Sequence, residues 1–161
     1  LEEERDANEE LGFLLRLYKK SHSEGRNLDL TLPEHNIYIP THEQNRRADR
    51  VIWAGLGCQP RSRGDVKLRD VPTMVVEFPS SRPADQRRDY EEKRIEYRDA
   101  GVQEYWIIDR FRRTLTVYRW RGKRWTKSTI KEGEVYATQF LPGFKLELSK
   151  LLEISDQYRD Q

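Results

Sequence analysis

The sequence has a single cysteine and no long apolar run, and both absences limit the kind of protein it encodes. Cys58 has no second cysteine with which to form an intrachain disulfide, which fits a protein of a reducing compartment. No stretch approaches the roughly 20 apolar residues of a membrane-spanning helix, and the first residues lack the pattern of a signal peptide. We therefore predict a cytoplasmic protein with no membrane partner.

Several signatures of catalysis are also missing. The three histidines, His22, His35 and His42, have no metal-ligand spacing, which argues against a zinc site. The sequence contains no GxSxG nucleophile motif, no glycine-rich phosphate loop and no paired CxxC. The sequence has 30 Lys and Arg and 28 Asp and Glu, so the net charge of +2 does not by itself indicate a nucleic-acid binder.

The composition is nevertheless that of a folded domain. The apolar fraction of 35% is low and the charged fraction of 36% is high, but four Trp, eight Tyr and five Phe argue against disorder. The length suits one domain, so we predict a single domain over residues 1–161. Because the chain begins with Leu1 rather than Met, we expect this domain to lack a short N-terminal segment.

The apolar pattern predicts helices near the beginning, middle and end of the chain. Residues 2–20 carry apolar side chains at helical spacing, with acids first and lysines last. A second helix is predicted for residues 83–100, because Pro83 suits a first turn and Gly101 suits a stop. Residues 149–154 predict a short terminal helix.

Short runs of alternating, β-branched and aromatic residues predict strands. They cover residues 28–32, 36–40, 49–55, 73–78, 104–109, 114–120, 124–130, 134–140 and 143–148. A polar loop spans residues 57–72, and the strand–helix–strand unit over 77–109 predicts a right-handed crossover between parallel strands. The order of elements indicates an α/β fold with a mixed β-sheet flanked by helices and a C-terminal β-meander.

Glu77 is unusual because it interrupts the apolar face of the strand within PTMVVEFPSS (72–81). A buried ionised carboxylate costs several kcal/mol unless a cation, a metal or hydrogen-bond donors compensate it. The next helix places Lys93 on the stripe that faces the sheet, together with Tyr90 and Tyr97. Lys93 and Glu77 can therefore meet, either in a functional site, in a structural ion pair, or not at all if Lys93 extends to the helix edge.

Asp49 adds a second carboxylate at the start of another predicted strand. Two carboxylates from neighbouring strands can hold Mg²⁺, which prefers oxygen ligands and keeps several waters. With Lys93, the set suits phosphodiester hydrolysis, because a metal polarises the phosphoryl oxygen and an ammonium stabilises the developing charge. Taken alone, Asp49 is also a common strand-initiating turn residue, and that alternative stays open.

The residues around these three positions resemble a known family. The block VVEFPSSRPADQRRDYEEKRIEYRDAGVQEYWIID (75–109) is similar to the core of the Uma family of restriction-like endonucleases, within the PD-(D/E)xK nuclease superfamily. ADRVIW (48–53), LPGFKLEL (141–148) and the leading helix extend the similarity. The resemblance implies a restriction-endonuclease-like fold and a Mg²⁺-dependent endonuclease acting on DNA, with Mn²⁺ as a substitute. It implies Asp49 and Glu77 as metal ligands and Lys93 as the catalytic lysine.

The chain departs from the family pattern at three places. Pro79 stands where the superfamily's ExK pattern places lysine, so activity depends on Lys93. Ala48 replaces the usual proline before the aspartate, which is a mild change. The family often has an acidic residue in an upstream hairpin, which this chain begins too late to show, and Glu4 and Asn8 are weak candidates for that role.

Basic residues near the three positions are the expected DNA contacts. Arg46 and Arg47 flank Asp49, together with Arg50, and Arg87 and Arg88 precede Lys93 along the helix. We interpret the other basic clusters as solvated surface, the four tryptophans as packing rather than base-stacking residues, and the aspartate that ends the 104–109 strand as a turn residue.

Three functions are compatible with these patterns. The first is a Mg²⁺-dependent DNA endonuclease, the second is a catalytically inactive nuclease-fold module that binds DNA or protein, and the third is a structural domain that forms oligomers. We expect a homodimer, which is compatible with all three. Metal binding and cleavage assays distinguish the first from the others.

Overall fold

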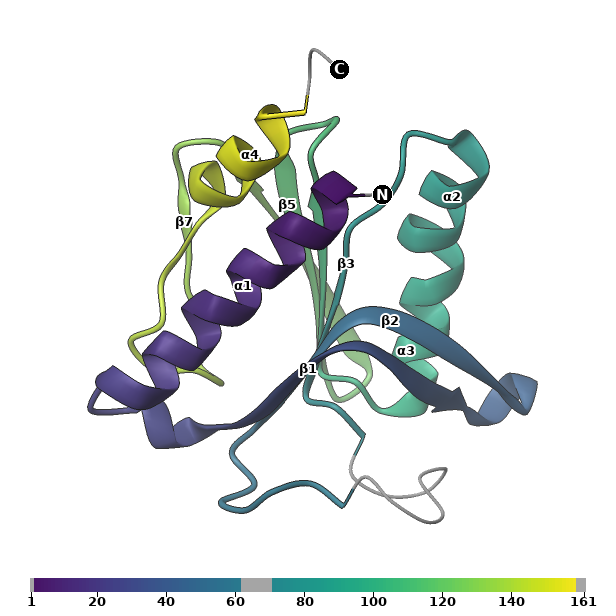
Figure 1. The fold of residues 1–161 in the computed structure, drawn as a ribbon. Coiled ribbons are helices and arrows are strands. Elements are labelled where there is room, and N and C mark those ends of the chain that lie inside the picture. Colours follow the sequence, from purple (N-terminus) through teal and green to yellow (C-terminus); the bar gives the residue numbers. More distant parts are fainter. Residues whose placement is uncertain (1, 62–70, 159–161) are drawn as a thin grey trace.

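A computed structural model describes residues 2–61 and 71–158, which form one mixed sheet with helices on both of its faces (Figure 1). The sheet has the strand order β1-β2-β3-β4-β5-β6. Its strands are β1 (Leu28–Ile39), β2 (Gln44–Ala54), β3 (Met74–Glu77), β4 (Glu104–Asp109), β5 (Thr114–Arg121) and β6 (Arg124–Lys131). The β3–β4 pair is parallel and the other pairs are antiparallel, which confirms the parallel pair that the strand–helix–strand unit predicts.

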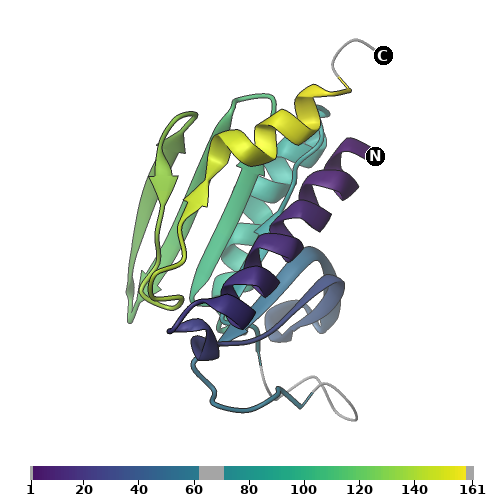
Figure 2. The same ribbon diagram turned by 60° about the vertical axis from the view of Figure 1, so that its left-hand side comes forward.

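Helices α1 (Glu2–Ser21) and α4 (Leu148–Asp156) cover one face of the sheet, and the helix formed by α2 (Pro83–Arg87), η4 (Arg88–Glu92) and α3 (Lys93–Ala100) covers the other (Figure 2). Each face has its own core. Leu11, Leu15 and Trp106 belong to the core under α1 and α4, whereas Tyr97 and Tyr105 belong to the core under α3. Burial of these two apolar layers is the main force that stabilises the sandwich.

The helix that faces the site contains one irregular turn. Segment η4 is π-helical, and the N–H of Lys93 donates to the carbonyl of Arg88, five residues earlier. A π-turn inserts one extra residue into the helical repeat and shifts the side chains that follow. The predicted helix over residues 83–100 is therefore confirmed as one continuous element, with a change of phase just before Lys93.

Two of the predicted strand boundaries are wrong. The segments 28–32 and 36–40 belong to the single strand β1, and β2 begins at Gln44, so Asp49 lies inside a strand rather than at its start. The polar residues at the beginning of β2 pair with the end of β1, where Ile37 and Ile39 are buried in the core under α3. A two-stranded arm needs backbone hydrogen bonds but no alternating apolar pattern, which is why the sequence pattern missed it.

The C-terminal meander is shorter than predicted. Strands β5 and β6 join the main sheet, whereas β7 (Val135–Tyr136) and β8 (Leu146–Glu147) pair with each other in a separate two-stranded sheet. Two shorter turns, η1 (Gly25–Asn27) and η2 (Pro40–His42), flank β1. Of the predicted 57–72 loop, residues 62–70 lie outside the described part. In the parts of the chain that are described, no helix combines the length and apolarity needed to cross a membrane.

Candidate active site

Asp49, Glu77 and Lys93 come together where β2 and β3 stop pairing. The last paired residues are Arg50 and Val76, so Asp49 and Glu77 are the next residues along their strands. The backbone N–H of Asp49 donates to Oε1 of Glu77 at 2.8 Å, and Nζ of Lys93 contacts Oε2 of the same carboxylate. The structure thus assembles, from β2, β3 and α3, the three residues that the sequence proposes.

Glu77 and Lys93 are both buried, and each compensates the other's loss of water. The main-chain N–H of Phe78 donates to Oδ2 of Asp49 at 2.7 Å, which orients the second carboxylate. No hydrogen bond engages Oδ1 of Asp49 among the described residues. Asp49 lines a cleft of about 690 Å³ between α1 and the β1–β2 arm, whereas Glu77 and Lys93 are not among its lining residues.

The backbone around Asp49 is irregular. Ala48 and Val51 both lie in the core under α3, three residues apart, so the strict alternation of β2 changes phase between them. Glu34 lies opposite this point on β1 and has a positive φ of 47°, which is uncommon for a residue other than glycine. With this change of phase, Asp49 is half-buried at the cleft, and the side chain of Arg50 is buried under α1, where it also borders the cleft.

Asp89 is a fourth member of the site that the sequence analysis missed. Its carboxylate is buried, and Oδ1 lies 3.1 Å from Nζ of Lys93. The two residues are four apart in the helix, which is the spacing at which side chains meet. That spacing was the available signal, but the Asp89 position was interpreted as part of a solvated, basic cluster.

The carboxylates resist ionisation in this setting. Burial raises the pKa of Glu77 to about 8, with a smaller opposing effect of Lys93 and additional repulsion from Asp49 and Asp89. Burial also raises the pKa of Asp49, which the Phe78 hydrogen bond and Lys93 partly offset. The pKa of the Lys93 ammonium is raised by Glu77 and Asp89 in spite of its burial, so it stays charged.

Helix α1 holds the strand that carries Asp49. Asn8 donates through Nδ2 to the carbonyl of Asp49 at 2.7 Å and accepts through Oδ1 from Nε of Arg50 at 2.6 Å. Arg50 is only 2% exposed, and burial lowers its pKa to about 10. A Cβ atom at Gly12 would lie 2.6 Å from the Arg50 guanidinium, so this glycine provides the space for it.

Glu4 and Asn8, the two residues of α1 considered for the family's upstream acidic position, lie in different places. Asn8 contacts the backbone of Asp49 rather than offering a carboxylate, and it acts in the structure as a link between α1 and β2. Glu4 lines the same cleft as Asp49. Burial raises the pKa of Glu4, and the charges of Asp49 and Asp89 raise it further.

The donor set fits a hydrated divalent cation. Carboxylates whose pKa values are raised by burial and mutual repulsion are those that a bound cation would stabilise in the ionised form. The buried hydroxyl of Tyr97, which feels the charges of Glu77, Asp49 and Asp89, has no hydrogen-bond partner among the described residues, and water around a cation can satisfy it. In residues 2–61 and 71–158 no group of three His, Cys, Asp or Glu side chains forms a ready-made metal cage. Mg²⁺, which binds through one or two carboxylates and retains water, needs no such cage.

Most of the arginines expected to contact DNA are engaged in ion pairs. Arg46 makes a bidentate pair with Glu96 at 2.5 and 3.0 Å, and Arg50 is buried. Arg47 pairs with Glu34 at 2.8 Å.

The two helix arginines differ from each other. Arg88 lies 3.2 Å from Asp85, whereas Arg87 is exposed and has no ion pair in the described part of the chain. Asp109 accepts backbone hydrogen bonds from Phe111 and Arg112, as its interpretation as a turn residue requires, and also accepts from the Tyr90 hydroxyl at 2.8 Å.

The mixed sheet, its flanking helices and the residues at the end of β3 define a restriction-endonuclease-like α/β domain. The chain belongs to the Uma2 family, described as "Putative restriction endonuclease", whose model matches residues 2–149. This result confirms the family resemblance and the fold class that the sequence predicts.

A solved structure agrees with that assignment. The crystal structure of "a putative nuclease belonging to DUF820" from Anabaena variabilis is similar to this chain with a TM-score of 0.68 and 14% sequence identity. The similarity covers 95% of this chain and 82% of that one, and at this identity it supports the fold alone. Among curated proteins, no sequence matches the chain.

Proposed function

We propose that this protein is a Mg²⁺-dependent endonuclease that hydrolyses DNA phosphodiester bonds, with Asp49 and Glu77 as metal ligands and Lys93 as the catalytic lysine. The observation that carries the proposal is the convergence on one carboxylate: Asp49 donates its N–H to Glu77, and Lys93 contacts the other oxygen of Glu77. The family and the fold support the broader class, a nuclease.

The side chains have complementary tasks in this reaction. Mg²⁺ bound by the two carboxylates would polarise a phosphoryl oxygen and lower the pKa of a water molecule. Lys93 carries three N–H donors. Two are directed at Glu77 and Asp89, which leaves one for a phosphate oxygen as negative charge develops there.

The bond changes balance within this site. The oxygen of water bonds to phosphorus, the bond from phosphorus to the leaving sugar oxygen breaks, and that oxygen takes up a proton. The attacking water gives up one proton to solvent and keeps the other on the new phosphate group, and solvent supplies the proton that the leaving sugar oxygen takes up. Burial of Glu77 and Lys93 keeps bulk water away from the charged pair, which strengthens the attraction between the Lys93 ammonium and a phosphate.

A catalytically inactive module that binds DNA or protein is the second candidate. Both oxygens of Glu77 already contact donor groups of the protein. The strand position at which the superfamily has its lysine is occupied by Pro79. A protein with this arrangement can keep the fold without binding a cation.

Metal titration and cleavage distinguish the two functions. Calorimetry with Mg²⁺ and Mn²⁺ should show binding by the unmodified protein, loss of binding by Glu77→Gln, and no change for Glu153→Gln, an exposed carboxylate on α4. Plasmid, linear duplex, single-stranded and branched DNA should be tested with each ion and with EDTA. The absence of both divalent binding and cleavage would support the inactive module.

A further inference from the structure

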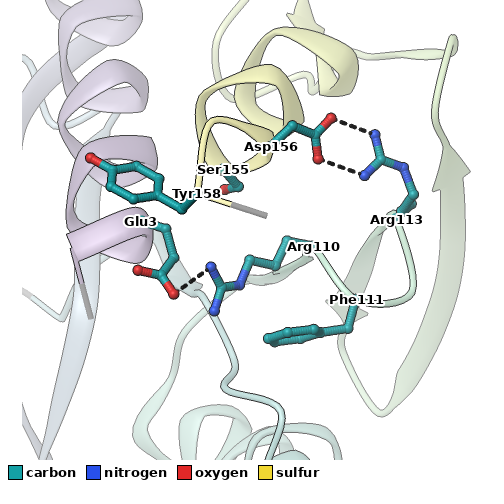
Figure 3. Close-up of a pocket in the computed structure, with 7 residues that line it drawn as sticks. All are labelled: Glu3, Arg110, Phe111, Arg113, Ser155, Asp156 and Tyr158. Atoms are coloured by element: carbon teal, nitrogen blue, oxygen red, sulfur yellow. Dashed lines mark hydrogen bonds and ion pairs between the residues drawn. The ribbon is translucent and has the colours of Figure 1, made fainter. Parts of the chain in front are cut away.

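The turn between β4 and β5 is fixed on one side and exposed on the other. Arg110 pairs with Glu3 of α1 at 2.8 Å and Arg113 pairs with Asp156 of α4 at 2.9 Å, around a cavity of about 390 Å³ (Figure 3). These contacts neutralise both arginines. Phe111, from the same turn, also borders this cavity, with its ring centre 4.5 Å from the guanidinium carbon of Arg110, and is 46% exposed (Figure 3).

Cations and aromatic rings lie together on the flank of the α2–α3 helix where Arg94 contacts Tyr118 of β5 and Trp125 of β6. We call this set the flank strip. Its members are Arg87, Tyr90, Arg94, Arg112, Trp125 and Lys127. Arg87, Tyr90 and Arg112 line one end of it, a cavity of about 540 Å³ that Phe111 also borders.

Each end of the flank strip contains a contact between a ring and a cation. The guanidinium carbon of Arg112 lies 4.4 Å from the ring centre of Tyr90, and that of Arg94 lies 5.1 Å from the ring centre of Trp125. The positive charges of Arg94 and Arg112 both act on the hydroxyl of Tyr118, whose pKa is raised by burial. Lys127 approaches the same ring at 5.9 Å.

The positive charge of the flank strip is least compensated at its β5–β6 end, because Glu91 lines the cavity at the other end beside Arg87. Residues 114–131 contain six Lys and Arg and no Asp or Glu. Within the described residues, Arg87, Arg94 and Lys127 form no ion pair, and Arg112 has only Asp109, at 3.7 Å. Trp125 is 47% exposed beside these cations.

We propose that the flank strip binds a single-stranded segment of nucleic acid, with its phosphates on Arg87, Arg94 and Lys127 and a base stacked on Trp125. Basic grooves with exposed aromatic rings suit single strands, because unpaired bases expose faces that a duplex hides. The Arg87 end of the strip is also lined by Ser81 and Pro83, from the loop that follows Glu77. The inference builds on the proposed nuclease function by naming the form of substrate that reaches the site, and it revises the interpretation of Trp125 as a packing residue only.

Binding without divalent metal tests the flank strip separately from cleavage. The variant Trp125→Leu plus Lys127→Gln removes the stacking ring and one cation while leucine still covers Tyr118. The matched control is Phe13→Ala plus Lys20→Gln on α1, where Phe13 is 53% exposed. Fluorescence anisotropy in EDTA should compare labelled oligo(dT) of about 12 nucleotides, within the usual site size of a single-strand binder, with a duplex of the same length.

We expect the strip variant to bind oligo(dT) at least about 10-fold more weakly than the control, with its salt slope reduced by about 0.7 for the lost phosphate contact. Duplex binding should change much less. Equal oligo(dT) affinity in the two variants would overturn the proposal, and so would an equal loss for duplex and single strand. Binding to anionic phospholipid vesicles, but not to oligo(dT), that is lost in the strip variant would assign the strip to membranes instead. If oligo(dT) binding behaves as expected but no substrate is cleaved, the flank strip stands and the nuclease proposal fails.

Discussion

The N–H of Asp49 and the side chain of Glu77 form a hydrogen bond of 2.8 Å one residue beyond the last paired residues of β2 and β3. A side-chain carboxylate thus takes the place that a main-chain carbonyl would occupy in the next step of the ladder. The contact joins the two proposed metal ligands directly. A change at either residue is therefore expected to disturb the other.

Lys93→Met should abolish most cleavage while divalent binding remains, because both carboxylates are retained. Loss of one such charge stabiliser costs about 10² to 10³ in rate. Methionine keeps the stem length beside Tyr97, so the protein should fold. Steady-state cleavage and calorimetry measure the two effects, with Lys150→Met on α4 as the control. Cleavage by Lys93→Met at the unmodified rate would make Lys93 a structural residue.

Adding Pro79→Lys to Lys93→Met should restore part of the activity. The second change returns an ammonium to the strand position that the superfamily uses. Partial recovery of the cleavage rate, with unchanged divalent affinity, would show that what matters is where the positive charge lies, whether the strand or the helix carries it. No recovery in a folded double variant would show that the strand position cannot replace the helix.

Asp89→Asn should weaken the hold on Lys93. The substitution keeps the shape of the side chain but removes the charge 3.1 Å from Nζ. We expect kcat to fall with little change in KM, and the free energy of unfolding to fall by roughly 1–3 kcal/mol. Urea unfolding and cleavage kinetics measure these changes. Asp99→Asn, on the exposed side of the same helix, should change neither.

Divalent affinity should depend on pH because protons compete for Glu77. With a pKa of about 8 in the folded protein, affinity should rise from pH 5 to about 8 and then level off, at up to about tenfold per pH unit. In the metal-free protein, the folded state holds this proton more tightly than the unfolded state, where the ordinary pKa is 4.5. Stability should therefore fall as pH rises from about 4.5 to about 8.

The variant Glu77→Gln separates this effect from other titrations. The glutamine side chain does not titrate, so the Tm of this variant in EDTA should vary less over the same pH range. A metal affinity of the unmodified protein that stays constant between pH 5 and 8 would place the Glu77 carboxylate outside the metal site.

Gly12→Ala should destabilise the link between α1 and β2. The new methyl group would lie 2.6 Å from the Arg50 guanidinium, which is held by Asn8 and Thr31 and cannot move without breaking those bonds. Overpacking of this kind costs about 1–3 kcal/mol, more than the gain of up to about 1 kcal/mol from replacing glycine in a helix.

A double-mutant cycle with Arg50→Met measures the clash. Gly12→Ala should cost little in the Arg50→Met background, because the guanidinium is gone. Equal costs in both backgrounds, from urea unfolding, would show that the two residues do not interact.

Sequence periodicity by itself determined the central pair of the site. Alternation in a strand sends Glu77 to a buried face, and the helical repeat sends Lys93 toward the same face, so their meeting follows from two local rules. The parallel β3–β4 pair follows in the same way from the strand–helix–strand unit. The position of Asp49 at a predicted strand start suggested a second carboxylate, and the family resemblance implied that it is a metal ligand.

Only the tertiary structure decided what surrounds the pair. Asp89 lies within a π-helical turn, and its spacing of four residues from Lys93 did not by itself show that its carboxylate is buried. The partner of each arginine depended on distant residues. Arg46 pairs with Glu96, fifty residues away, whereas Arg94 lies over the rings of Tyr118 and Trp125. The local sequence predicts on which face of its own helix or strand a side chain lies. The charges it meets come from other elements, and their positions follow from how the whole sheet and its helices pack.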